Sequence, residues 1–209
     1  MKAIIFDLDG VLVFTDKFHY QAWKQIADQL GVYFDEKVND RLRGVSRAES
    51  LEIILERYDG ALSFEEKQNY LEEKNNIYRS YLETMTEADV SAEVRDTLKK
   101  LHDAGYLLAV GSSSKNAGYI LERTDLKKYF DAVSDGNNIT HSKPDPEVFL
   151  KAAEYLGVEP VECFVVEDAD AGIDAAKAAG MRAVGIGQAS LYKKADVSIR
   201  RLDELLYQM

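Results

Sequence analysis

Residues 3–15 read AIIFDLDGVLVFT, and this stretch decides the fold. The apolar run before the first aspartate is typical of a strand that is buried on both faces in the middle of a parallel sheet. Two carboxylates, Asp7 and Asp9, follow this run, and Gly10 permits a sharp turn after them. Ligands of open α/β sheets bind at the carboxyl ends of the strands, so we expect both carboxylates at a binding site. Taken alone, the pattern also fits an acidic turn after a strand.

The composition narrows the class of partner. The chain has 209 residues, of which 46% are hydrophobic, and its net charge is −11, from 26 basic and 37 acidic residues. This charge argues against nucleic acid or an anionic membrane as a partner, whereas a small anionic substrate needs only a local group of cations. A single cysteine, Cys163, excludes an internal disulfide and predicts a reducing, cytoplasmic location. Because its neighbours are apolar, we expect this thiol to be inert core. No signal peptide or membrane span is visible, and we expect a monomer.

A helical segment follows the first strand and extends over residues 16–87. Apolar residues recur every four positions from Phe18 to Leu30, which is typical of an amphipathic helix. Two capping-box patterns, Ser46 with Glu49 and Ser63 with Glu66, each precede a further helix. The segment is therefore expected to form a helical bundle inserted directly after a catalytic strand, where it is placed to act as a lid.

From residue 88 onward, helical and strand patterns alternate. We expect strands at residues 106–110, 132–134, 163–166 and 183–186, and a last helix at 202–206. Asp145 is expected to cap a helix at 147–156, and Asp170 a helix at 171–179. The alternation predicts an α/β protein with a Rossmann-like doubly wound parallel sheet. Residues 1–15 and 88–209 form this core in our prediction, and residues 16–87 form an inserted helical cap domain.

Chemically useful side chains follow several of the expected strands. The loop Gly111 to Ser114 offers hydroxyls and free backbone donors that could hold phosphate oxygens. Lys143 supplies a positive charge on another loop. Glu167 and Asp168 supply hard oxygen ligands of the kind that Mg²⁺ prefers. Together with Asp7 and Asp9, they predict a metal-assisted phosphate site at one edge of the sheet.

Four of these motifs, FDLDG, the serine after the second strand, SKPDPE and VVEDADAG, resemble those of the haloacid dehalogenase superfamily of phosphotransferases. The resemblance extends over essentially the whole chain and implies a four-helix cap. It implies that Asp7 is the nucleophile, which forms an aspartyl-phosphate, and that Asp9 is the general acid/base. It also implies phosphate binding by Ser112 and Lys143. The implied cofactor is Mg²⁺, held by Asp7, Glu167, Asp168 and the backbone carbonyl of Asp9.

Residues of the cap resemble those of the sugar-phosphate mutases in this superfamily. Such enzymes interconvert β-glucose 1-phosphate and glucose 6-phosphate, with glucose 1,6-bisphosphate as the priming intermediate. The resemblance implies that Arg47, Ser114 and Asn116 hold the distal phosphate, with Lys115 nearby, and that Thr15, His19 and Lys74 couple the cap to Asp9. The remaining substrate-binding candidates are Gly44, Val45, Ser46, Trp23 and Asn75. Arg43 departs from the pattern, because a lysine is usual there.

Other interpretations of the function stay open. The first is a phosphatase that hydrolyses a small sugar or polyol phosphate with the same core machinery, and the second is a non-enzymatic sugar-phosphate sensor. Two single residues also have ordinary alternatives, since His19 could be a helix-face histidine and Lys74 could belong to a solvated charged face. Arg47 opens a helix, where a cation opposes the helix dipole, so an anionic ligand explains it better than helix stability does.

Overall fold

Within residues 2–208, six parallel strands form one sheet. A computed structural model describes residues 2–208. In chain order the strands are β1 (Ala3–Phe6), β2 (Leu107–Gly111), β3 (Ala132–Ser134), β4 (Cys163–Glu167), β5 (Arg182–Gly185) and β6 (Val197–Ser198). Their order across the sheet is β3-β2-β1-β4-β5-β6, and every neighbouring pair is parallel. This doubly wound sheet confirms the predicted fold class. It also places β1, with Asp7 after it, at the point where the strand order reverses.

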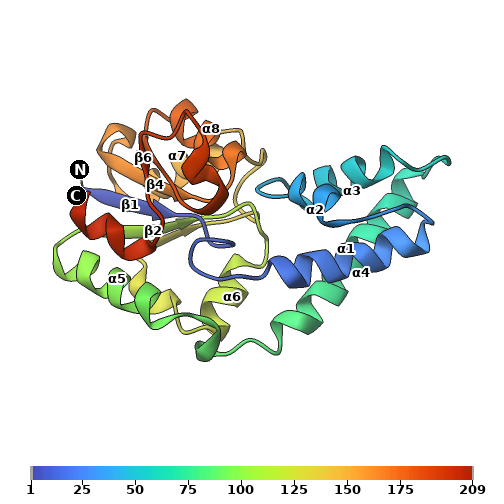
Figure 1. Cartoon of the computed structure of the whole chain (residues 1–209), viewed down its shortest axis with the longest axis horizontal. Helices are drawn as coiled ribbons and strands as arrows, with labels where there is room; N and C mark the ends of the chain where they lie inside the picture. Colours follow the sequence, from blue (N-terminus) through green and yellow to red (C-terminus); the bar gives the residue numbers. More distant parts are fainter. Residues whose placement is uncertain (1, 209) are drawn as a thin grey trace.

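Helices cover both faces of the sheet. The core helices are α5 (Ala92–Asp103), α6 (Ala117–Arg123), α7 (Glu147–Leu156) and α8 (Asp170–Ala178). In Figure 1, α5 and α6 lie on one side of the sheet and α7 and α8 on the other. Short 3-10 helices occur at Glu87–Asp89, Lys127–Tyr129, Pro160–Glu162, Gly187–Leu191 and Leu202–Tyr207. Successive side chains of β1 point to opposite faces of the sheet, so both faces are apolar. Ile4 and Phe6 pack in one apolar layer, and Ala3 and Ile5 pack in the other.

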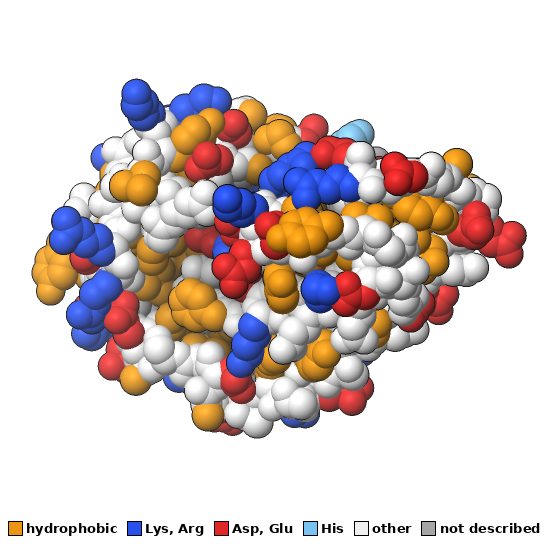
Figure 2. All heavy atoms as spheres, turned by 45° about the vertical axis from the view of Figure 1, so that its right-hand side comes forward, with side chains coloured by type: hydrophobic (Ala, Val, Ile, Leu, Met, Phe, Trp, Pro, Cys, Tyr) orange, Lys and Arg blue, Asp and Glu red, His pale blue; other side chains and the backbone are white. Residues whose placement is uncertain are grey.

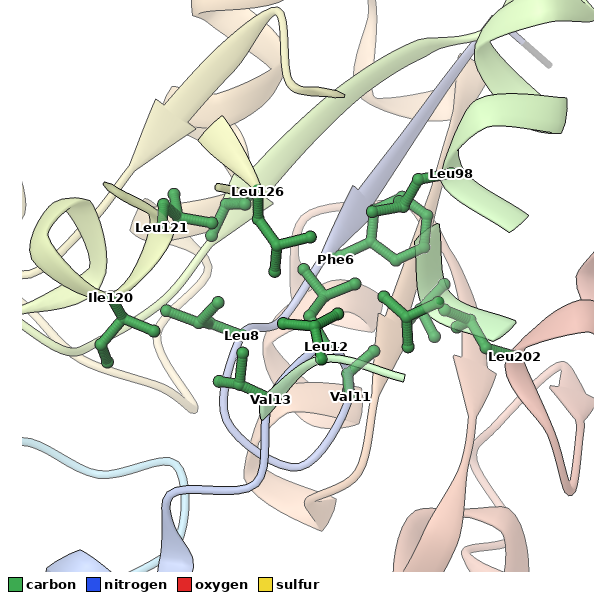
Figure 3. Close-up of a cluster of buried hydrophobic side chains, with 14 of the residues drawn as sticks. Phe6, Leu8, Val11, Leu12, Val13, Leu98, Ile120, Leu121, Leu126 and Leu202 are labelled. Carbon is green, nitrogen blue, oxygen red and sulfur yellow. The ribbon is translucent and has the colours of Figure 1, made fainter. Parts of the chain in front are cut away.

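The turn after β1 is anchored in the core. Leu8, Val11, Leu12 and Val13 are all at most 2% exposed. Figure 3 shows these four side chains among apolar residues of α5, α6 and the adjoining segments. Burial of this turn holds the backbone on both sides of Asp9 in place, so the position of the carboxylates follows from the packing of the core.

Helices α1 to α4 pack together, away from the sheet (Figure 1). They are α1 (Asp16–Gln29), α2 (Glu36–Asp40), α3 (Arg47–Leu55) and α4 (Phe64–Leu82). Their apolar cluster includes Trp23, Ile26, Phe34 and Leu51. Both capping boxes form, since Ser46 and Ser63 each bond reciprocally with the glutamate three residues later. The observed helices number four, as the resemblance implies, and the domain division at residues 16–87 stays a proposal.

Several details differ from the prediction. Pro146 occupies the N-cap position of α7, so Asp145, whose carboxylate accepts a bond from the Glu147 amide, lies one residue outside it. Asp170 is the first residue of α8 and Ala169 is its N-cap, because the helix starts directly after the β4 loop. Helix α2 and strand β6 were not predicted, since neither is long enough to show a period. The expected last helix is a 3-10 helix, and strands β2 and β5 are each shifted by one residue.

Cys163 lies at the start of β4 and is fully buried. Burial raises the pKa of its thiol to about 11. The prediction of an unreactive core thiol is therefore supported, because the reactive thiolate is scarce at neutral pH. Across residues 2–208, no helix has the length and apolar character needed to cross a bilayer.

Candidate active site

A cleft of about 440 Å³ lies between the carboxyl edge of the sheet and the helices α1, α3 and α4. The predicted site residues that line it are Asp7, Asp9, His19, Trp23, Gly44, Val45, Ser46, Arg47, Lys74, Ser112, Ser114, Lys115, Asn116, Lys143, Glu167 and Asp168. Two others, Thr15 and Asn75, do not line the cleft but contact residues that do. The volume is in the ordinary range for a pocket that holds a small ligand.

Three carboxylates meet at the base of the cleft. Asp7, Glu167 and Asp168 each offer an oxygen within 4.8 Å of the others. Gly10 makes this approach possible, because its φ is +92° and a Cβ on it would lie 2.1 Å from Asp168 Oδ2. Gly172 does the same for Glu167, whose carboxylate would meet a Cβ at 2.0 Å. Both glycines therefore keep room for the acidic cluster.

Lys143 is the cation of this cluster. Its Nζ lies 2.5 Å from Asp7 Oδ1 and 2.5 Å from Glu167 Oε1, and the side chain is 1% exposed. Burial alone lowers the pKa of a lysine, but here the charges of Asp7 and Glu167 outweigh it and raise the pKa of Lys143 above its ordinary value. Lys143 is therefore a permanent positive charge beside Asp7.

One ammonium group does not balance three carboxylates. Burial and the neighbouring carboxylates raise the pKa values of both Glu167 and Asp168. Among the described residues, Asp168 has one cation within 4.0 Å, Arg43, at 3.6 Å. A cluster of hard oxygen donors with excess negative charge fits a divalent cation such as Mg²⁺. The side chain of Asp9 is not part of this cluster, so its expected contribution is limited to its backbone carbonyl.

Asp9 has a different environment from Asp7. Its Oδ1 accepts a hydrogen bond from the Thr15 hydroxyl, and Thr15 in turn accepts one from the Tyr78 hydroxyl at 3.2 Å. Burial, aided by the charge of Asp7, raises the pKa of Asp9 to about 7, although the Thr15 bond opposes the rise. A carboxyl group with this pKa can both give and take a proton near neutral pH, as a general acid/base must.

The predicted coupling residues are adjacent. Lys74 Nζ lies 2.9 Å from His19 Nδ1, and the His19 ring packs on Tyr78 with centroids 4.1 Å apart. Burial, together with Lys74 and Arg47, lowers the pKa of His19 well below its usual value. Because His19 is thereby held neutral, its Nδ1 can accept a bond from Lys74. Lys74 is 2% exposed, which excludes the alternative of a solvated charged face.

The loop after β2 offers fewer free backbone donors than expected. The Ser112 amide donates to the Ser134 carbonyl, and the Ser114 amide donates to the Ser112 hydroxyl. Within residues 2–208, the amides of Leu8, Asp9 and Ser113 have no hydrogen-bond acceptor, and Asp9 and Ser113 line the cleft. The free Ser113 amide agrees with the donors expected in this loop, whereas those of Leu8 and Asp9 were missed, since residue types do not reveal free amides. All three suit a phosphate oxygen.

The other end of the cleft carries Arg47 from α3. Its Nη1 donates to the Leu71 carbonyl at 3.3 Å, and no carboxylate of the described chain lies within 4.0 Å of it. Across the cleft, Ser114, Lys115 and Asn116 come from the start of α6. A half-buried arginine without a counterion indicates a site for an anion.

Sequence reasoning missed several residues of the site. Tyr78, 1% exposed, lines the cleft and bonds Thr15, but it is one of twelve tyrosines and no motif marks it. Ser113 donates to the Gly44 carbonyl at 3.2 Å, which joins the β2 loop to the cap. Arg43, which the sequence marked only as a departure from the mutase pattern, bonds Asp16 of α1 and lies 3.6 Å from Asp168. These contacts join parts of the chain that are distant in sequence, so no local pattern contains them.

One face of the molecular surface has mixed charge. The face turned forward in Figure 2 carries Asp and Glu side chains intermixed with Lys and Arg, with apolar side chains between them. Surface charges of this kind are screened by salt, whereas half-buried and buried cations keep their effect. Among the cations of the cleft, buried Lys143 and half-buried Arg47 therefore keep their attraction for an anionic ligand, whereas Lys115 is exposed.

The sequence of this chain is similar to those of known phosphate-transferring proteins. The family model described as haloacid dehalogenase-like hydrolase matches residues 1–180. The chain belongs to the haloacid dehalogenase-like hydrolase family. Within that family it is 40% identical to β-phosphoglucomutase of Bacillus subtilis, over all of this chain and 93% of that protein. It is also 34% identical to a phosphorylated carbohydrates phosphatase of Thermotoga maritima, over 88% of this chain and 84% of that protein.

Solved structures show the same relationship. The crystal structure of β-phosphoglucomutase from Clostridium difficile superposes with a TM-score of 0.94 at 38% identity, and the match covers all of this chain and 94% of that one. The predicted membership of the haloacid dehalogenase family is thus confirmed. Membership explains the order of motifs around the sheet, while the choice between mutase and phosphatase depends on the cap end of the cleft.

Proposed function

We propose that this chain interconverts β-glucose 1-phosphate and glucose 6-phosphate, with β-glucose 1,6-bisphosphate as the intermediate. The observation that carries the proposal is that the same cleft is lined by Lys143 with the acidic cluster and by Arg47 with Ser114, Lys115 and Asn116. In our proposal these two groups are two separate anion sites. A bisphosphate that turns around within the cleft needs both. The similarity to two β-phosphoglucomutases supports the same choice.

Asp7 is the nucleophile in this proposal. One of its carboxylate oxygens attacks phosphorus, and the phosphate ester bond of the bisphosphate breaks. Lys143 stabilises the negative charge on the transferring group, and the amides of Leu8 and Asp9 can donate to its oxygens. The product is an aspartyl-phosphate, which divides one difficult transfer into two easier ones.

Asp9 moves the proton. It gives its proton to the leaving sugar oxygen in the first step. Asp9 then takes the proton from the free 6-hydroxyl of a β-glucose 1-phosphate, and the attack of that oxygen on phosphorus breaks the bond to Asp7 and forms β-glucose 1,6-bisphosphate. The bisphosphate turns around within the cleft before it passes its other phosphate to Asp7. The pKa of about 7 lets the group perform both tasks near neutral pH. Thr15 and Tyr78 orient it, and His19 with Lys74 connects it to the cap.

The proposed cofactor is Mg²⁺, held by Asp7, Glu167, Asp168 and the Asp9 carbonyl. When bound, it neutralises the charge of the carboxylates and of the phosphate that approaches them. We propose that residues 16–87 act as a lid that excludes water during transfer. We place the enzyme in the cytoplasm as a monomer, in agreement with its single, buried cysteine.

The alternative is a phosphatase that hydrolyses a small sugar or polyol phosphate, and the Thermotoga maritima relative favours it. Replacing Arg47 with alanine separates the two. A charged hydrogen bond to phosphate contributes about 1.5–3 kcal/mol, so we expect isomerisation to slow roughly ten- to hundred-fold. Release of phosphate from a small monophosphate, which does not reach Arg47, is expected to change less than about three-fold.

The rates of isomerisation and of phosphate release are measured in one sample. The sugar phosphates are separated by chromatography, and inorganic phosphate is measured with a colorimetric assay. Arg41→Ala is the matched control, because Arg41 is an exposed cap arginine paired with Glu56. It should leave both rates unchanged. If Arg47→Ala lowers the rates of isomerisation and hydrolysis by the same factor, or lowers neither rate, Arg47 does not bind the distal phosphate as we propose.

A further inference from the structure

Helix α4 of the cap contacts helix α6 of the core beside the cleft. Arg79 Nη1 donates to Asn116 Oδ1 at 3.3 Å, and the guanidinium carbon lies 4.6 Å from the centroid of the Tyr119 ring. One turn earlier on α4, Asn75 Oδ1 accepts a bond from Asn116 Nδ2 at 3.0 Å. Two residues of α4, one turn apart, therefore hold two residues of α6 that are also about one turn apart.

The chemistry of the cleft makes no use of Arg79. It does not line the cleft, and within the described residues no carboxylate lies within 4.0 Å of it. The stacked Tyr119 and the acceptor Asn116 both belong to the core. An exposed cation whose partners lie across the junction between cap and core stabilises the arrangement in which the cap lies against the core.

Arg79 also determines which way the Asn116 amide faces. A guanidinium group can only donate, so the oxygen of the amide must be the atom that faces Arg79. The amide nitrogen then donates one hydrogen to Asn75 and keeps a second for another acceptor. Asn116 is 5% exposed and lines the cleft, so the group free to meet a ligand there is a donor. A donor in that position suits an anion.

We propose that Arg79 is a positioning residue that holds the cap closed and orients Asn116 toward the distal phosphate. The inference rests on the proposed function for the identity of the anion, while the contact itself does not depend on it. Closure and binding are coupled, because the contact forms only when α4 lies against α6. Loss of Arg79 thus weakens binding at the distal site without touching Asp7 or Asp9.

The test compares Arg79→Ala with wild type and with two controls. Alanine is the best helix former and the site is exposed, so the variant should fold and unfold at the wild-type temperature. We expect the KM for the sugar phosphate to rise about five- to ten-fold, with a smaller change in kcat, because one charged hydrogen bond and one cation–π contact are lost. Two controls should behave as wild type. Arg41→Ala removes an exposed cap arginine that pairs with Glu56, and Tyr119→Phe keeps the aromatic ring that Arg79 contacts.

A second measurement does not need turnover. Small-angle X-ray scattering of the full chain, with Mg²⁺ and saturating inorganic phosphate, reports how far the cap is open. Arg79→Ala should give a larger radius of gyration than wild type, and its affinity for phosphate should be lower. Identical scattering and an unchanged KM would overturn the proposal, even if the enzyme is a mutase. A larger radius of gyration for Arg79→Ala, in a chain that does not isomerise, would uphold the closing role of Arg79 and contradict the proposed function.

Discussion

Replacing Asp7 with asparagine should abolish turnover, with a loss of at least about 10⁴-fold in kcat. The amide keeps the size of the side chain but cannot attack phosphorus or carry a phosphoryl group. Lys143 still has Glu167 as a partner in the variant, so the fold should remain intact. Trapping of the phosphorylated enzyme by acid quench and intact-mass measurement should show no added phosphate.

Asp174→Asn is the control for this experiment, because Asp174 pairs with Lys194 away from the cleft. Asp9→Asn gives the contrast, since it retains the nucleophile and lacks only the proton carrier. It should turn over slowly yet still accept phosphate on Asp7. A residual rate within about 100-fold of wild type for Asp7→Asn would place the nucleophile elsewhere.

Replacing Lys143 with methionine should impair both stability and catalysis. The variant keeps the length and the apolar stem of the side chain but leaves the carboxylates of Asp7 and Glu167 buried without their cation. Breaking a buried ion pair from one side costs about 3–5 kcal/mol, so the free energy of unfolding should fall by roughly that amount. The rate should also fall about 10²-fold or more, because the charge that faces the transferring group is lost.

Urea denaturation in the presence of EDTA measures the stability without help from a metal ion. Lys67→Met is the matched control, since Lys67 forms an ion pair with Glu52 on the cap and is partly exposed. We expect that pair to contribute less than about 1 kcal/mol. A Lys143→Met protein as stable as this control would mean that the two carboxylates are not both ionised in the native state.

Local chemistry explains which parts of the fold could be predicted. The apolar run before Asp7 and the alternation after residue 88 reflect burial of strands and of one face of each helix, and both were visible in the sequence. The capping boxes at Ser46 and Ser63 satisfy backbone donors within four residues, so they too were predictable. Helix α2 and strand β6 are held by their neighbours, and so no period marked them.

The residues of the site can likewise be separated into those that local sequence predicts and those that it does not. The carboxylates of the acidic cluster lie at or just after the ends of β1 and β4, and parallel strands end at one edge, so Asp7, Glu167 and Asp168 could be expected together. The hydrogen bonds of Tyr78 and Arg79 join residues 63 and 37 positions apart, through packing of the cap. The free amides at Leu8 and Asp9 depend on the backbone path alone. None of these follows from residue type or spacing.

The most direct test of the central claim is product analysis by ³¹P NMR. The wild-type chain is incubated with β-glucose 1-phosphate, Mg²⁺ and a trace of β-glucose 1,6-bisphosphate, and glucose 6-phosphate and inorganic phosphate are followed in the same tube. Omission of Mg²⁺, with EDTA present, is the blank. We predict glucose 6-phosphate as the main product, formed only with Mg²⁺. Accumulation of inorganic phosphate and glucose, with no glucose 6-phosphate, would contradict the account.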